Sequence, residues 1–234
     1  MARRYHDVMR DLVDAVVAGR FEAGGSLPAE AELALRFGCG RGTIREALRG
    51  LEERGLVAAR PARPPRVRDR AAWDLRDPEV LAASIAHGPE SAVLAHAIDA
   101  RAAVEREAAA RAIRHATEGD LRLLTGHVDA MIAVARTDRV RTPGAGDPFV
   151  VAETWFHHVL GLLSDNPVLA KLAEPLHLVL AGTRHRRAPQ RERAVVQHHR
   201  RILEGLAARE PELTGDAIAA YARALTRWLV TDPR

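Results

Sequence analysis

Cysteine, aromatic residues and long apolar runs are all scarce in this chain of 234 residues. The single cysteine, Cys39, cannot form an internal disulfide, which favours a reducing compartment. Aromatic residues make up 4% of the chain and hydrophobic residues 47%, a balance typical of an Ala- and Leu-rich helical protein rather than a β-sandwich. No apolar run reaches about 18 residues, and no apolar signal segment follows the first residues. We therefore expect a cytoplasmic protein that does not enter the membrane.

Lysine is nearly absent as well, because Lys171 is the only one among many arginines. The net charge is +4, and the whole of this excess lies between Met1 and Arg70, while the remainder of the chain is neutral. A biased genome composition would explain the preference for arginine but not this uneven distribution of charge. The pattern predicts a module that binds a polyanion, joined to a domain with a different task.

Apolar periodicity predicts three helices in the first segment, over about residues 5–19, 28–38 and 41–54. Pro28 suits a helix start, while Gly38 and Gly55 suit helix ends. Only three residues, 38–40, separate the second helix from the third, which is typical of a helix-turn-helix. Residues 56–60 and 66–68 can form two strands around a turn at 61–65. The segment is therefore predicted to be a winged helix.

Strand signals disappear after Trp73, and Ala- and Leu-rich helical patterns punctuated by Pro and Gly continue to the C-terminus. We expect six or seven helices in an antiparallel bundle. The fold class is therefore predicted to be mainly α, with a winged helix-turn-helix at residues 1–70, a linker at 71–78 and an all-helical domain at 79–234.

The N-terminal segment resembles the GntR family of bacterial transcription regulators over about residues 5–69. The matching residues are Leu27-Pro-Ala-Glu30, Leu33, Phe37-Gly38, Arg41, Thr43-Ile-Arg-Glu-Ala-Leu48, Leu51 and Gly55-Leu56. Independently of this resemblance, Arg41, Arg45 and Arg49 are spaced along one edge of the third helix, where they can reach phosphates and guanine edges in a major groove. The resemblance implies that Arg41 and Arg45 make the main DNA contacts and that Thr43 contacts a phosphate. In the wing, Arg63 is the expected contact.

The rest of the chain, from about residue 73 to 230, resembles the all-helical FCD effector domain of the FadR subfamily. The matching residues are Trp73-Asp-Leu-Arg-Asp-Pro-Glu-Val-Leu81, Asp99-Ala-Arg101, Glu105, Phe156-His157 and Asn166-Pro-Val-Leu169. In many such domains an Asp and three His bind a divalent metal that helps to hold a small carboxylate effector.

Helix phase selects the candidate metal ligands in this chain. Glu153 and His157 are four residues apart and share a face, while His199 lies on the apolar side of its helix. Two imidazoles and a carboxylate suit Zn²⁺ or a similar cation. Glu153 stands where the family has Asp, and Trp228, or Arg227 in the alternative register, stands where the family has its last His. Both a three-ligand metal site with open positions and a metal-free pocket remain open.

Arg101 and Glu105 are also four residues apart, on the inward face of their helix. An arginine among aliphatic side chains needs a partner because an unpaired buried charge is costly. Glu105 is one candidate partner. The resemblance favours another role, in which Arg101 binds a carboxylate of the effector.

Three functions compete. The first is a ligand-responsive regulator, not an enzyme, that binds a palindromic DNA operator as a homodimer and responds to a small carboxylate. The second is a metal-dependent hydrolase or lyase using Glu153, His157 and His199, and the third is an architectural DNA-binding protein without an effector. No HExxH pair, nucleophile motif or phosphate loop supports the enzyme. We expect the first function, with a long acyl ligand as the main rival to the carboxylate.

Overall fold

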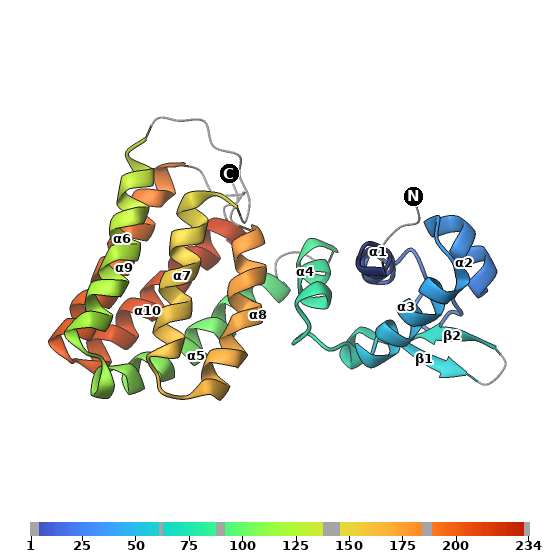
Figure 1. The fold of residues 1–234 in the computed structure, drawn as a ribbon, viewed down its shortest axis with the longest axis horizontal. Coiled ribbons are helices and arrows are strands. Elements are labelled where there is room, and N and C mark those ends of the chain that lie inside the picture. The colour runs from blue at the N-terminus through green and yellow to red at the C-terminus, as the bar shows by residue number, and fades with distance from the viewer. Residues whose placement is uncertain (1–4, 61–62, 88–91, 138–145, 184–188, 232–234) are drawn as a thin grey trace. The chain divides into compact units, whose positions relative to one another are not determined.

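The computed structural model describes residues 5–60, 63–87, 92–137, 146–183 and 189–231. The chain divides into two compact units, Met1–Pro89 and Glu90–Arg234, which are described separately. Both are built mainly from helices (Figure 1). The mainly helical fold class predicted from the sequence is confirmed.

The N-terminal unit is a winged helix. It contains helices α1 (Tyr5–Val17), α2 (Glu30–Phe37) and α3 (Arg41–Glu53), strands β1 (Val57–Arg60) and β2 (Arg63–Val67), a 3₁₀ turn (Arg70–Ala72) and helix α4 (Pro78–His87). The strands form an antiparallel hairpin, here called the wing, in which Val57 is paired with Val67. Glycines in the left-handed conformation follow α2 and α3, at Gly38 with φ 62° and Gly55 with φ 70°. These glycines end the helices where the sequence predicted.

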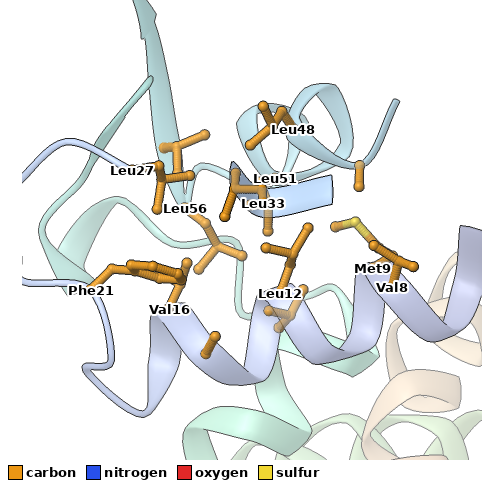
Figure 2. Packing of buried hydrophobic residues seen from close by; sticks show 14 of the residues in the cluster. Val8, Met9, Leu12, Val16, Phe21, Leu27, Leu33, Leu48, Leu51 and Leu56 are labelled. Atoms are coloured by element: carbon orange, nitrogen blue, oxygen red, sulfur yellow. The ribbon is translucent and has the colours of Figure 1, made fainter. Parts of the chain in front are cut away.

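The apolar stripe of α1 forms the centre of this unit. Figure 2 shows Val8, Met9, Leu12 and Val16 of α1 turned towards side chains from α2 and α3 and from the start of the wing. Leu12, Leu33, Leu51 and Leu56 are completely buried. Burial of this shared core holds α3 in place beneath its exposed, arginine-rich surface.

The second strand of the wing begins earlier than predicted. The sequence suggested a turn over residues 61–65, whereas β2 already starts at Arg63 and includes Pro64 and Pro65. Prolines are accepted there because β2 pairs with β1 on one side only, apart from an isolated bridge between Ser26 and Arg66. The carbonyl of Pro65 accepts a hydrogen bond from the Leu27 N–H at 2.9 Å. Residues 61 and 62, at the expected tip, lie outside the described residues.

Helix α4 packs with the N-terminal unit. The sequence placed the start of the C-terminal domain at residue 79, within this helix, but in the structure α4 packs against α1. Arg54 at the end of α3 forms ion pairs with Asp77 at 2.9 Å and Glu79 at 3.6 Å. His87 Nε2 lies 2.5 Å from Asp14 Oδ1 of α1. These contacts connect both ends of α4 to the winged helix.

The C-terminal unit is a bundle of long helices. They are α5 (Ala92–His115), α6 (Glu118–Ala135), α7 (Pro148–Leu162), α8 (Pro167–Thr183), α9 (Pro189–Ala208) and α10 (Pro211–Thr226), followed by a π-helical turn (Arg227–Thr231). Helix α5 packs against α7, α8 and α10, while α9 packs against α6 and α10 (Figure 1). Several helices begin at a proline, which has no N–H to leave unpaired in the first turn: Pro78, Pro148, Pro167 and Pro211. No helix among the described residues is both long and apolar enough to span a membrane.

Two glycines with the same backbone conformation provide a test of the packing behind α3. A Cβ at Gly55 would lie 2.2 Å from the carbonyl oxygen of Ala72, whereas a Cβ at Gly19, with φ 73°, would meet nothing within 4 Å. We expect Gly19→Ala to lower the free energy of unfolding by about 1 kcal/mol, for the left-handed φ alone. Gly55→Ala should cost about 1 to 3 kcal/mol more, because the chain behind α3 must shift. Urea denaturation of both variants measures the difference, and equal losses would contradict the close contact with Ala72.

Candidate functional site

The three arginines predicted to read DNA are exposed on α3. Arg41, Arg45 and Arg49 are exposed, while the apolar residues between them, such as Ile44 and Leu48, are buried. Thr43, the predicted phosphate contact, is half-buried. The amphipathic pattern of α3 thus holds one face in the core and presents a row of guanidinium groups on the other.

Arg45 is held by a carboxylate from the start of α2. Arg45 Nη2 donates to Glu30 Oε2 at 3.1 Å, and Nε donates to Glu30 Oε1 at 3.5 Å. This hydrogen-bonded pair raises the pKa of Arg45 above its already high usual value. Because Nε and Nη2 face Glu30, the Nη1 side of the guanidinium points away from the pair.

A groove of about 440 Å³ separates α3 from the wing. Arg45, Arg49 and Arg63 all line it, whereas Arg41 and Thr43 do not. Arg60 of β1 also lines the groove and was missed by the sequence prediction, which treated it only as a strand residue. The remaining lining residues are Pro28, Ala29, Glu30, Leu48, Glu52, Val57, Ala59, Pro64 and Pro65. Four arginines in one groove make a surface suited to a phosphate backbone.

A second group of functional candidates lies inside the helical bundle. All five residues predicted for effector and metal binding are almost completely buried: Arg101, Glu105, Glu153, His157 and His199. Two further buried residues join them, His177 from α8 and Tyr221 from α10. We call these seven residues the buried polar cluster.

Glu105 accepts contacts from three directions. Its Oε1 lies 2.9 Å from His157 Nδ1, 2.8 Å from His177 Nε2 and 3.5 Å from Arg101 Nε. Burial alone would raise the pKa of Glu105, but the neighbouring His157 and Arg101 hold it well below its usual range. Glu105 is therefore a carboxylate that orients the groups around it.

The imidazoles of His157 and His199 meet through their Nε2 atoms, which lie 3.1 Å apart. His199 Nδ1 donates to the carbonyl of Val195 at 2.8 Å, and His157 Nδ1 faces the Glu105 carboxylate. His199 Nδ1 therefore carries a hydrogen, because a carbonyl oxygen cannot donate. Burial lowers the pKa of His157 to about 4, so this ring is neutral near pH 7. The two Nε2 atoms are thus close enough to share a hydrogen or to bind one cation.

Glu153 completes this arrangement. Ligand atoms of Glu153, His157 and His199 all lie within 4.8 Å of one another, so the structure brings together the three residues predicted as metal ligands. Glu105, His157 and His177 form a second group of the same kind, although Glu105 there already accepts contacts from both rings. Two imidazole nitrogens and a carboxylate oxygen are a donor set that suits Zn²⁺.

Neither Trp228 nor Arg227, the residues that stand where the family has its last His, was predicted to bind a metal. In the structure Arg227 is exposed and Trp228 packs against His198. The α10 side chain in the cluster is Tyr221, which donates a hydrogen bond to Glu153 Oε1. Helix phase could have found both missed residues. His177 lies on the buried face with Ala173, Leu180 and Ala181, and Tyr221 with Ala217, Ile218 and Leu225.

Arg101 has a partner and yet keeps unused donors. It forms the expected ion pair with Glu105, and its guanidinium carbon lies 5.4 Å from the centre of the Tyr221 ring. However, its Nε and Nη1 are buried and donate no hydrogen bond to any described residue. A buried, unsatisfied guanidinium is costly, and an anion that accepts its hydrogen bonds removes this cost.

Comparisons with known proteins agree with both halves of this description. Residues 4–67 match the gntR family of bacterial regulatory proteins, and residues 96–224 match the FCD domain. The chain is 30% identical over 158 residues to the galactonate operon transcriptional repressor of Escherichia coli, covering 68% of this chain and 66% of that repressor. It is 25% identical over 224 residues to the repressor NanR of Klebsiella aerogenes, covering 94% and 82% of the two chains.

Solved structures show the same fold. The structure of Lar from Listeria monocytogenes superposes with a TM-score of 0.67 at 18% identity, covering 97% of this chain and 96% of the other. Escherichia coli McbR/YncC superposes with a TM-score of 0.53 at 19% identity, covering 98% of each chain.

These comparisons distinguish between the three functions that the sequence left open. The family and its relatives are transcription regulators, and nothing in the comparisons supports a metal-dependent hydrolase or lyase at Glu153, His157 and His199. With a GntR winged helix followed by an FCD domain, the chain belongs to the FadR subfamily of the GntR family of bacterial transcription regulators.

Proposed function

We propose that this regulator is a repressor whose affinity for a palindromic operator changes when a small carboxylate binds in the buried polar cluster. The observation that carries the effector half is Arg101, which is 1% exposed and has two nitrogens without hydrogen-bond acceptors among the described residues. The names of two relatives, both repressors, support the direction of regulation. A protein that binds operator DNA would act in the cytoplasm.

The DNA-reading surface is the exposed face of α3 together with the wing. Glu30 contacts the Nε and Nη2 side of Arg45, which leaves the outer side of this guanidinium for guanine O6 and N7 in the major groove. Arg41 is assigned a second base contact. Thr43 and Arg49 are assigned to phosphates, and Arg63 of the wing to the minor groove or a phosphate.

Exposed apolar side chains support a homodimer formed through the C-terminal unit. Val151, Trp155 and Leu162 of α7 are exposed and, at 100° per residue, lie within about 40° of one another around the helix. On α8, which packs against α7, Val168 and Leu172 are also exposed. We propose that a second copy of the chain covers these residues, because a two-fold dimer matches the two half-sites of a palindromic operator.

A divalent cation fits between the residues predicted to hold it. The Nε2 atoms of His157 and His199 lie 3.1 Å apart, close enough for both to bind one cation. Glu153 supplies a carboxylate oxygen beside them, and Val195 and Glu105 fix the two rings through their other nitrogens. When bound, Zn²⁺ or a similar ion would act as a Lewis acid that attracts an anionic ligand.

The same surroundings favour a small carboxylate as the effector. Arg101 offers planar donors that suit a carboxylate fork, and Glu105 holds the guanidinium in place. The name of one relative mentions galactonate, which is a sugar acid, so hydroxy acids and sugar acids form the class we propose.

Replacing Arg45 tests the DNA-reading surface. Arg45→Ala should weaken binding to a DNA fragment selected from a random pool by the wild-type protein, at a cost of about 1 to 3 kcal/mol. Arg10→Ala is the matched control, because Arg10 is an exposed arginine of α1, outside α3 and the wing. Gel-shift titrations at two salt concentrations measure both effects, and raised salt should weaken wild-type binding steeply. Unchanged affinity and sequence preference for Arg45→Ala would contradict the assignment.

A thermal-shift screen with hydroxy acids and sugar acids tests the effector site. A carboxylate that stabilises the wild-type protein should bind Arg101→Lys about 10- to 100-fold more weakly, since lysine keeps the charge but loses the two-pronged geometry. Arg114→Lys, at an exposed site of the same helix, is the control. His199→Ala should lower the metal content and reduce the response. If a ligand stabilises the wild type and Arg101→Lys equally, Arg101 does not bind the effector and is only a structural partner of Glu105. A screen without any hit would contradict the proposal that the effector is a small carboxylate.

A further inference from the structure

Tyr221 is in contact with every residue proposed to hold the metal. Its hydroxyl donates a hydrogen bond to Glu153 Oε1. Its ring stacks on His157, with 5.9 Å between ring centres and 3° between planes, and meets His199 edge-on at 4.9 Å. With 1% of its surface exposed, Tyr221 is enclosed together with these three residues.

Glu153, His157 and His199 supply three donors for a metal, which are one carboxylate and two imidazoles. Helix α10 brings the Tyr221 hydroxyl oxygen into hydrogen-bond contact with Glu153, one of these three residues. A structural zinc site is almost always four-coordinate, and a ligand must be deprotonated to bind the ion.

We propose that Tyr221 is the fourth ligand of the metal, which it binds through its phenolate oxygen. This inference rests on the metal site proposed above. On metal binding, the phenol proton that now points to Glu153 is released to solvent, and the oxygen–metal bond takes its place. The site then has two nitrogen and two oxygen donors, and the negative phenolate offsets part of the charge that the cation brings into the bundle.

This assignment also connects the metal with the proposed effector residue. The guanidinium of Arg101 lies 5.4 Å from the centre of the Tyr221 ring, so the fourth ligand and the unused donors of Arg101 are neighbours. A carboxylate bound by Arg101 would therefore lie next to a metal whose fourth position is filled from within the chain. It would have to displace the phenolate or add a fifth ligand.

Zinc titration of full-length protein stripped of metal by a chelator tests the proposal. The chain has two tyrosines, Tyr5 and Tyr221, so ionisation of one phenol is assignable by mutation. Zinc itself is colourless, and an ultraviolet difference spectrum reports phenolate formation. We expect one phenolate per zinc bound in the wild type and in the matched control Tyr5→Phe. In Tyr221→Phe the signal should be absent, and zinc affinity should fall by about 10- to 100-fold or more.

Tyr221→His is a second variant that keeps a ring and a donor at the site. It shows whether a loss of zinc binding in Tyr221→Phe reflects a folding defect. It should bind zinc tightly without any phenolate signal. Zinc binding by the wild type without phenolate formation, or with equal affinity in Tyr221→Phe, would overturn this inference and leave Tyr221 as a hydrogen-bond donor to Glu153. If neither the wild type nor Tyr221→His bound zinc, the metal site itself would be overturned.

Discussion

The buried charge of Glu105 is the constraint around which the C-terminal unit is arranged. A carboxylate that is 2% exposed is strongly destabilising unless neighbouring groups compensate it. Arg101 of the same helix, His157 of α7 and His177 of α8 all meet its Oε1. A single oxygen atom thereby joins side chains from three helices. The loss of any of these partners would leave the buried charge of the cluster less well compensated.

This arrangement has consequences for the rest of the cluster. Because His157 directs Nδ1 to Glu105, its other nitrogen, Nε2, faces the Nε2 of His199. Although Arg101 forms an ion pair with Glu105, its Nε and Nη1 form no hydrogen bond with any described residue. Under the proposed function, Glu153, His157 and His199 would bind a cation, and Arg101 would bind an anion. Such a pair of sites would explain why a bundle rich in alanine and leucine buries so many polar side chains.

The sequence was sufficient to predict the fold and much of the candidate site. The features that it did not predict have a common physical cause. Helix periodicity located the inward positions of Glu153, His157 and His199, and left-handed glycines marked the ends of α2 and α3. Helix phase also places His177 and Tyr221 on buried faces, but the groups that they contact come from distant segments. His177 meets Glu105 from 72 residues away, and Tyr221 meets Glu153 from 68 residues away. The early start of the wing's second strand likewise depends on pairing with β1, which local proline content could not show.

We propose that each protomer of a dimeric regulator encloses a metal ion and a small anion within its C-terminal bundle. A native mass spectrum of the purified full-length protein tests this most directly, because it measures subunit number and bound mass together. We expect the mass of a dimer carrying one metal ion per protomer, with a further small mass when a carboxylate effector is added. A monomer with no bound metal, whose mass is unchanged by every carboxylate and by added zinc, would contradict it.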